Sequence, residues 1–499
     1  MADESQKHIL FLTGKLAEKR LHRVLESMQS TESAEFSYEV KDIGVSVAAL
    51  MTASMIQRRL SPSDVEGFDQ VLVPGLCRGD LDAVGEQLGL PIIRGTEDLK
   101  DLPVFFGGDA EPPDLSRYDV ALFAEIVDAP MLDIPAILSR AAKYREDGAD
   151  VIDVGCLPDT PFPHLEETIE ALHGEGHHVS VDSLEEDDLV RGGKAGADYL
   201  LSLKESSLWI ADEVDSIPVL IPDRHKDMDS LYRAIETLDR KGRSFIADSV
   251  LDPIHFGFTE SLLRYLQLRQ QCPDIDIMMG IGNLTELTEA DTTGINAVLF
   301  GLISEMHITS ILTTEVSPHA RSAVREADRA RRIMYAARED HSLPKGYDDS
   351  LLTTHSRKPF PYTANEILEL AGEIRDPSYR VQISDEGISV YNRDGLKSGT
   401  DPFDLFPDLE LLQDDAPHAF YMGVELAKAQ IAWQLGKRYN QDELLDWGVA
   451  VPAVSREQQE ESTRAAHALR EGEYKQEGST LKASRKKKKK KKNYSVSGK

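Results

Sequence analysis

Four acid or amide side chains stand at the ends of short apolar runs, at the points where buried β-strands would stop. They are Asp153, Asp182, Asp252 and Asn283. If these strands run parallel and close into a barrel, their carboxyl ends meet at one rim, which is where barrel enzymes build their sites. Carboxylate and amide oxygens accept hydrogen bonds. The set therefore suits a flat ligand rich in N–H groups, and a pterin ring is a ligand of that kind.

A structural explanation exists for each aspartate taken singly. An Asp at a strand end is often the N-cap of the next helix, and Asp182 stands before Leu184 and two glutamates in a way that fits this role. Asp252 fits it least, because Pro253 and a glycine-containing loop delay the next helix. For four residues at corresponding places the capping explanation has to be repeated each time, so a shared site is the better hypothesis.

Eight apolar runs between residues 115 and 320 are expected to be the strands that position these side chains. Three of them, VIDVGC, YLLSLK and AVLFGL, each follow a Gly-x-Asp or Gly-x-Asn triplet, as when a helix ends on glycine and a buried parallel strand begins. The other five runs are Val120–Val127, His178–Asp182, Ile217–Ile221, Ser244–Asp248 and Ile275–Met279. This count predicts a TIM (β/α)8 barrel over residues 115–340. An open doubly wound sheet is the alternative.

Smaller domains are predicted on both sides of the barrel. In residues 1–110, the runs His8–Thr13, Phe36–Ile43 and Gln70–Val73 alternate with helical patterns, which indicates an open α/β domain. The stretch Gly107–Pro113 is the predicted linker to the barrel.

The region 361–452 is predicted to be a small α+β domain. The runs Tyr379–Ile383 and Ile388–Tyr391 are typical of a hairpin. A helix that Pro417 opens follows, with one apolar face made by Phe420, Val424, Ala427, Ile431 and Leu435.

Charge is distributed unevenly along the chain. The net charge is −31, and residues 481–499 carry ten Lys or Arg and no acid, which leaves −41 for the first 480 residues (−31 minus 10). So acidic a body argues against nucleic-acid binding. Residues 453–499 form a charged tail, expected to be disordered beyond residue 475. Its run Lys486–Lys492 offers contacts to nucleic acid or acidic partners, but a solvated, self-repelling tail explains it more simply.

The expected cellular compartment is inferred from segments and motifs that the sequence does not contain. No run approaches the about 20 apolar residues of a membrane span, and the charged start MADESQKH differs from a signal peptide. The cysteines Cys77, Cys156 and Cys272 lie far apart and form no CxxC motif. A cytoplasmic protein is the expectation.

The segments VIDVG, HVSVDS, LDPIHFGF and MGIGN, in this order, resemble the pterin-binding barrel family. That family includes dihydropteroate synthases and methyltetrahydrofolate methyltransferases. The likeness lies in order and spacing, and it covers the predicted barrel. HILFLTGKLAE near the start and IRDPSYRVQIS near the end extend it. With them, the whole chain is similar to the dihydropteroate synthase-related proteins of methanopterin-using microbes.

The resemblance implies roles for individual residues. Asp182 and Asp252 match family aspartates that hydrogen-bond the pterin, and Asp252 would accept from the ring N–H and the exocyclic amine. Ser202 stands where the family usually has Asn. Asn283 matches an Asn of the methyltransferase branch that serves the N5 side of the pterin.

Departures from the synthase pattern are equally informative. Glu125 replaces an Asn that helps to hold diphosphate and Mg²⁺. Gly282-Asn283-Leu284 replaces Ser-Arg-Lys, and Thr314-Glu315-Val316 replaces Arg-x-His. A diphosphate leaving group needs cations to absorb its charge, and this rim is acidic. Ordinary synthase chemistry on that substrate is not expected.

The sequence therefore predicts a transferase that binds a reduced pterin of the tetrahydromethanopterin or folate type. It would act in condensation at the pterin methyl carbon or in methyl transfer, with Asp153 and Glu125 as catalytic residues near the reacting end. No metal-ligand motif is predicted, although the acidic rim is compatible with Mg²⁺.

Two alternatives stay open. A non-catalytic subunit would position a pterin for one-carbon enzyme partners, and a homodimer is compatible with either function. A barrel for sugars or phosphates would need a glycine-rich phosphate loop after the seventh or eighth strand. Gly280 and Gly282 supply only half of such a loop.

Overall fold

The computed structural model describes residues 7–30, 36–108, 113–409 and 415–452, together with Gln458 and Glu461. The chain divides into two compact units, residues 1–351 and 352–499. The predicted linker lies partly, and the predicted disordered tail almost wholly, outside the described residues. No helix in the described ranges is both long enough and apolar enough to cross a bilayer.

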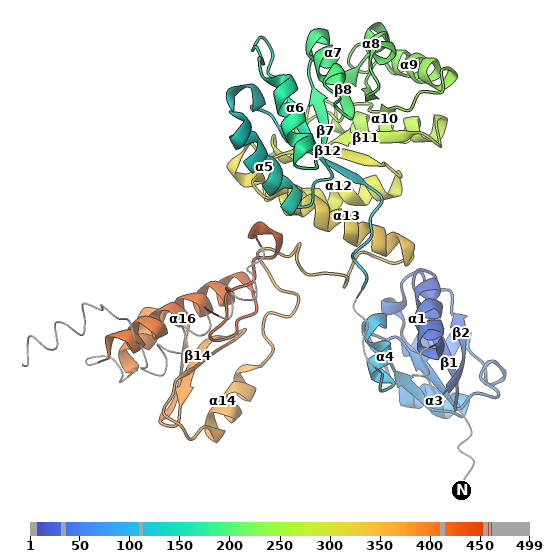
Figure 1. The fold of residues 1–499 in the computed structure, drawn as a ribbon. Helices are drawn as coiled ribbons and strands as arrows, with labels where there is room; N and C mark the ends of the chain where they lie inside the picture. Colours follow the sequence, from blue (N-terminus) through green and yellow to red (C-terminus); the bar gives the residue numbers. More distant parts are fainter. Residues whose placement is uncertain are drawn as a thin grey trace, which may run out of the picture. The chain divides into compact units, whose positions relative to one another are not determined.

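The N-terminal part of the first unit is an open, parallel α/β sheet, as predicted (Figure 1). The strand order is β2-β1-β3-β4. The strands are β1 (Lys7–Thr13), β2 (Phe36–Asp42), β3 (Gln70–Val73) and β4 (Ile92–Arg94), of which β4 was not predicted. The helices are α1 (Glu18–Ser30), α2 (Ala53–Arg59), α3 (Leu81–Leu88) and α4 (Leu102–Phe105). Alternate residues of β1 join two different apolar clusters, so both faces of the sheet are buried.

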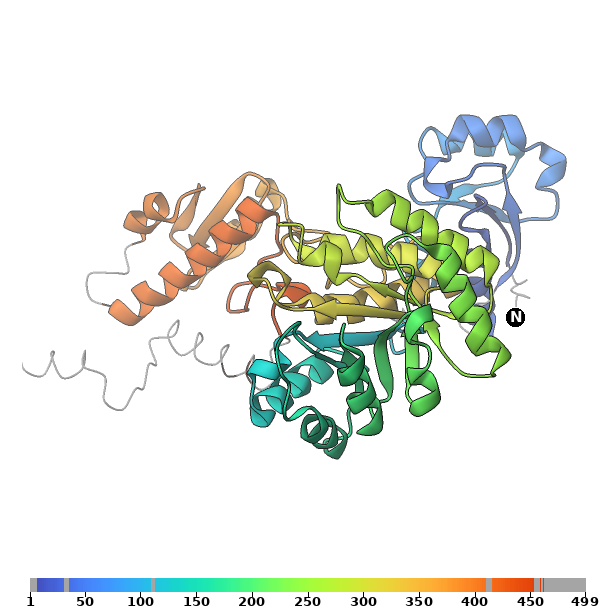
Figure 2. The ribbon, with the colours of Figure 1, turned by 90° about the horizontal axis from the view of Figure 1, so that it is seen from above.

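A closed barrel of eight parallel strands follows, which confirms the predicted TIM barrel. Its strands are β5 (Ala121–Ile126), β6 (Val151–Gly155), β7 (His178–Asp182), β8 (Tyr199–Leu203), β9 (Ile217–Leu220), β10 (Ile246–Ala247), β11 (Asp276–Gly280) and β12 (Ser310–Thr314). Figure 1 and Figure 2 show the helices arranged around these strands. They are α5 (Ile134–Glu146), α6 (Leu165–Gly174), α7 (Glu186–Lys194), α8 (Ile210–Glu213), α9 (Met228–Arg240), α10 (Phe258–Gln271), α11 (Gly282–Thr285), α12 (Thr292–Glu305) and α13 (Ala323–Glu339).

An apolar layer fills the interior of the barrel. It consists of Phe123, Val151, Leu201, Val219, Ile246 and Met278. Because side chains alternate along a strand, the residue two positions further on points to the same face. The next inward residues toward the carboxyl ends are Glu125 after Phe123, Asp153 after Val151 and Asp248 after Ile246. The layer thus forms the floor of an acidic mouth.

The prediction of one of the eight strands was wrong. AVLFGL belongs to helix α12, and the eighth strand is β12. Helix α12 is apolar on several sides, and on a side facing α13 the buried Asn296 donates to Glu326 at 2.9 Å. An apolar run without a polar face shows no helical period, so periodicity alone cannot separate it from a strand.

The second unit contains an antiparallel sheet of three strands, β13 (Arg380–Ser384), β14 (Gly387–Asn392) and β15 (Gly395–Gly399). Its helices are α14 (Ala364–Glu373), α15 (Pro402–Leu405) and α16 (Ala416–Leu435). The predicted hairpin and α+β class are confirmed. The face of α16 that was predicted to be apolar is exposed at Phe420, Val424 and Ile431. The sheet packs instead against another face of the helix, which includes Met422 and Leu426.

Arg331 of α13 closes the end of the barrel where the strands begin. Its side chain is 1% exposed and forms ion pairs with Asp328 and Asp150. The same guanidinium donates to the backbone oxygens of Val120 at 2.6 Å and Gly148 at 2.8 Å. One buried cation thus joins α13 to the starts of β5 and β6.

Replacing Arg331 with Met should lower the free energy of unfolding by about 2–4 kcal/mol, because it leaves two buried backbone acceptors and the Asp150 carboxylate without their cation, while Asp328 keeps Arg332. Urea unfolding followed by circular dichroism measures the change. The matched control is Arg240→Met, which removes an exposed pair with Glu236 and should cost about 0.5 kcal/mol or less. Equal losses in the two variants would contradict this account of Arg331.

Candidate active site

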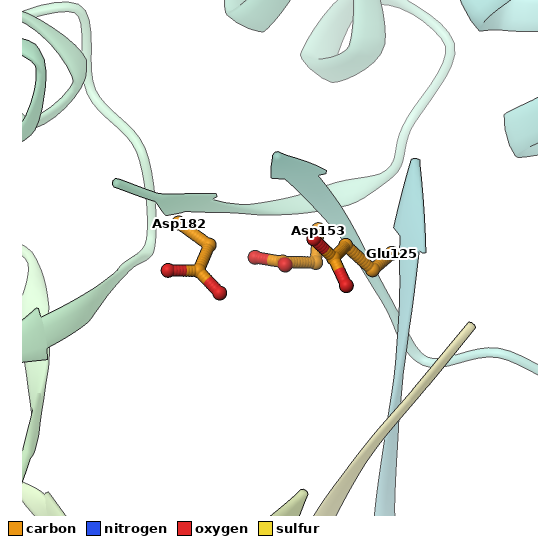
Figure 3. Close-up of side chains that lie close together, drawn as sticks. All are labelled: Glu125, Asp153 and Asp182. Atoms are coloured by element: carbon orange, nitrogen blue, oxygen red, sulfur yellow. The ribbon is translucent and has the colours of Figure 1, made fainter. Parts of the chain in front are cut away.

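Three carboxylates from neighbouring strands lie together at the mouth of the barrel. Glu125 of β5 is in register with Asp153 of β6, and Gly155 of β6 is in register with Asp182 of β7. One carboxylate oxygen from each side chain lies within 4.8 Å of the other two. Figure 3 shows the three carboxylates close to one another on the inner side of their strands.

Asp153 is the most deeply placed of the three. It is 0% exposed, and the hydroxyl of Ser180 donates to its Oδ1 at 2.5 Å. Its Oδ2 has no hydrogen-bond partner among the described residues. Burial raises the pKa of Asp153 to about 8, the charge of Glu125 adds to this, and the bond from Ser180 opposes it. Such a carboxyl group holds a proton far more readily than an exposed one.

Glu125 and Asp182 share this environment. Gly155 leaves room for the Glu125 carboxylate, since a Cβ at that position would lie 2.8 Å from its Oε1. Burial raises the pKa of Glu125 to about 8, with contributions from Asp182 and Glu286. Burial also raises the pKa of Asp182 well above its ordinary value, with contributions from Asp153 and Asp248. The charges that act on these groups are therefore mostly those of other acids.

Asp248 points into the barrel at the same level as Glu125 and Asp153, and it was not predicted as a site residue. It follows β10, and it accepts the Tyr265 hydroxyl at 2.5 Å and the Val250 N–H at 2.7 Å. Burial raises the pKa of Asp248 to about 6, although these hydrogen bonds lower it in part. Asp248 ends a predicted strand, so the rule that selected the other aspartates applies to it equally.

Asp252 lies in a different electrostatic setting. Arg264 Nη2 donates to its Oδ2 at 3.0 Å, and His225 Nε2 lies 2.6 Å from its Oδ1. Burial would raise the pKa of Asp252, but the bonds from His225 and Arg264 outweigh burial and hold the pKa below its usual value. Asp252 is an ionised, charge-balanced carboxylate.

Asn283 and Ser202 complete the predicted set. Asn283 Nδ2 donates to the backbone oxygen of Leu251 at 2.6 Å, which places the Asn283 side chain beside the loop that carries Asp252. Ser202 lies at a register irregularity of β8, next to Leu201, which pairs with Asp182. Glu125, Asp153 and Asp182 thus form one cluster. Asp252 lies on the loop after β10 and Asn283 in the short helix α11 beside that loop, and Ser202 lies on the strand beside Asp182.

One family model matches the N-terminal sheet domain, and one relative matches most of the chain. Residues 7–97 match a family described as of unknown function, DUF6513. A relative in Methanocaldococcus jannaschii, the uncharacterized protein MJ0107, is 25% identical over 529 aligned positions, which cover 87% of this chain and 98% of the relative.

Solved structures similar to this chain include dihydropteroate synthases. One is the Yersinia pestis enzyme with a pterine–sulfa conjugate, at 16% identity and a TM-score of 0.37 over 45% of this chain and 96% of that one. Another is 7,8-dihydropteroate synthase from Vibrio fischeri, at 16% identity and a TM-score of 0.35 over 45% of this chain and 95% of that one. The assignment of the fold rests on the closed barrel itself.

The raised pKa values lead to a prediction about stability. Above about pH 5 an unfolded carboxyl group has lost its proton, whereas folded Glu125 and Asp153, with pKa values of about 8, still hold theirs. The free energy of unfolding should therefore fall as pH rises from about 5 to about 8 and then level off. Urea unfolding across this range, in the presence of a chelator, measures the slope.

The Asp153→Asn variant should show a shallower slope, because one of these groups no longer ionises. The control is Asp159→Asn in the exposed loop after β6, which should keep the wild-type slope. An unchanged slope in Asp153→Asn would show that Asp153 does not hold a proton in the folded protein.

Proposed function

We propose that this protein binds a reduced pterin at the mouth of its barrel. It would act there in the synthesis or use of a one-carbon carrier of the tetrahydromethanopterin or folate type. The observation that carries the proposal is the cluster of Glu125, Asp153 and Asp182, in which no described donor except Ser180 reaches a carboxylate oxygen. A reduced pterin carries N–H groups on its reduced ring as well as on its pyrimidinone edge, and those of the reduced ring are donors that such a cluster lacks.

Asp182, Asp252, Asn283 and Ser202 are the proposed contacts to the pterin. The bonds from His225 and Arg264 leave Asp252 able to bind, because a carboxylate has about four acceptor positions and these two bonds use one on each oxygen. The two N–H donors of a pyrimidinone edge match the free positions. Asn283, beside the Asp252 loop, would then reach the other ring of the same ligand.

Asp153 and Glu125 are proposed to serve the reacting end. The reaction class is group transfer to or from the pterin, either condensation at its methyl carbon or methyl transfer. Glu315, in the segment that departs from the synthase pattern, bonds to Lys143 of α5 at 2.5 Å. A cytoplasmic location is part of the proposal, and so is room for Mg²⁺ at the acidic end, since Mg²⁺ prefers carboxylate oxygen.

A second candidate is a pterin-binding subunit that has no chemistry of its own and presents the carrier to partner enzymes, alone or as a homodimer. The acidic neighbours of the cluster favour it. The charges of Asp182 and Glu286 act on Glu125, and those of Asp153 and Asp248 act on Asp182. None of these groups would stabilise an anionic leaving group.

Calorimetry with the purified full-length protein tests the ligand. The titrants are 6-hydroxymethyl-7,8-dihydropterin, its diphosphate and a tetrahydropterin cofactor. An unphosphorylated reduced pterin should bind at least as tightly as the diphosphate, because an acidic mouth repels the added negative charge. Asp182→Ala should weaken this binding about tenfold or more, which corresponds to about 1.4 kcal/mol.

The control for this experiment is Glu186→Gln, an exposed acid at the start of α7, which should leave pterin affinity unchanged. Much tighter binding of the diphosphate would overturn the argument from charge. Glu125→Gln and Asp153→Asn then separate the two candidates. Retained pterin binding with lost turnover supports the enzyme, whereas turnover equal to that of the wild type removes both residues from the mechanism.

A further inference from the structure

We propose that Glu125, Asp153 and Asp182 bind one divalent cation of the oxygen-preferring class, such as Mn²⁺, Mg²⁺ or Ca²⁺. This inference takes further the room for Mg²⁺ that the proposed function includes, because it assigns the ion to the three carboxylates by themselves and requires no pterin. The three side chains come from consecutive strands of a closed barrel, so the backbone holds their ligand atoms in place.

The spacing of the cluster fits a single ion. Oxygen atoms of the three carboxylates lie within 4.8 Å of one another. Ligands of an ion that binds oxygen at about 2.1–2.5 Å lie about 3.0–3.5 Å apart when they are adjacent and about 4.2–5.0 Å apart when they are opposite. The spacing in the cluster leaves room for one ion among the three carboxylates, and small side-chain rotations would bring all three into contact with it. A ligand set made only of oxygen favours these cations over Zn²⁺ or Cu²⁺, which take nitrogen and sulfur more readily.

Asp153 supplies an observation independent of the clustering. Its Oδ1 is already bonded to Ser180, and its Oδ2 is buried without a partner among the residues that the structure describes. A buried oxygen in this state is unusual, because most buried polar atoms in proteins are satisfied. The carboxylates of Glu125 and Asp182 lie close to that of Asp153, as Figure 3 shows. A cation there would satisfy Asp153 Oδ2.

Electrostatics favour the same ligand. The charged groups that act on Glu125, Asp153 and Asp182 are one another, Glu286 and Asp248, all of them acids. Elsewhere in this mouth Asp252 has a basic partner in Arg264, so the lack of one here is local to the cluster. A divalent cation removes the mutual repulsion of three carboxylates, and the bond from Ser180 orients the ligand in the way seen around protein-bound metals. The bound ion would supply the positive charge that these side chains lack.

The test is binding of Mn²⁺ alone to full-length protein that has been stripped with a chelator. Electron paramagnetic resonance of free Mn²⁺ gives the stoichiometry and affinity, and Mg²⁺ serves as the competitor. We expect one saturable site per chain above the weak binding of an acidic surface. Asp153→Asn and Glu125→Gln should each weaken that site tenfold or more. Asp159→Asn, an exposed acid-to-amide change in the neighbouring loop, should leave it unchanged.

Two results would overturn the cation site. One is the absence of a saturable site in the wild type at millimolar Mn²⁺. The other is wild-type affinity in both Asp153→Asn and Glu125→Gln. Circular dichroism of each variant verifies folding, and the two substitutions alter different strands, so one misfolded variant leaves the other decisive. The titration contains no pterin. Loss of pterin binding with Mn²⁺ binding retained would therefore count against the proposed function alone.

Discussion

Closure of the barrel forces acidic side chains from neighbouring strands into one low-dielectric space, and this constraint governs the site. Parallel register sets Glu125 beside Asp153, and the pleat turns both residues inward above Phe123 and Val151. The apolar layer keeps water away from below, so ionised carboxylates there are costly. Protons, the N–H groups of a ligand or a cation must compensate. Each of the three can offset the cost of the buried negative charge.

The two ends of the barrel resolve the same problem in opposite ways. Strand β6 has Asp150 immediately before it and Asp153 within it. At the first end, Asp150 forms an ion pair with Arg331, a buried arginine anchored by further bonds to the backbone. At the second end, Asp153 meets other acids and a serine. The partly exposed Asp150 thus has a cation, whereas the buried Asp153 has none, so the cost of burying a carboxylate remains at the end where a ligand could remove it.

Much of the fold followed from the sequence, because seven strands carry apolar runs bounded by glycine or polar residues. The eighth failed because α12 is apolar on most sides, and its polar contact, Asn296 with Glu326, joins residues far apart in the sequence. At the site, the position of Asp153 and Asp182 at strand ends predicted that they share one rim, and the parallel register of the strands places them close together. The setting of Asp252 was not predictable, because it depends on His225 and Arg264 from two other elements.

The contrast between Asp252 and the acidic cluster defines how one ligand would be oriented. Asp252 is ionised, its charge is balanced by Arg264 and it is hydrogen-bonded to His225, so it can accept two N–H groups without needing a positively charged ligand. The cluster of Glu125, Asp153 and Asp182 is unbalanced and attracts a proton or a cation. A neutral heterocycle therefore has a reason to place its pyrimidinone edge at Asp252 and its reacting end toward the cluster. N–H recognition at Asp252 would then act at one end of the ligand, and the cluster would take up its proton or cation beside the reacting end.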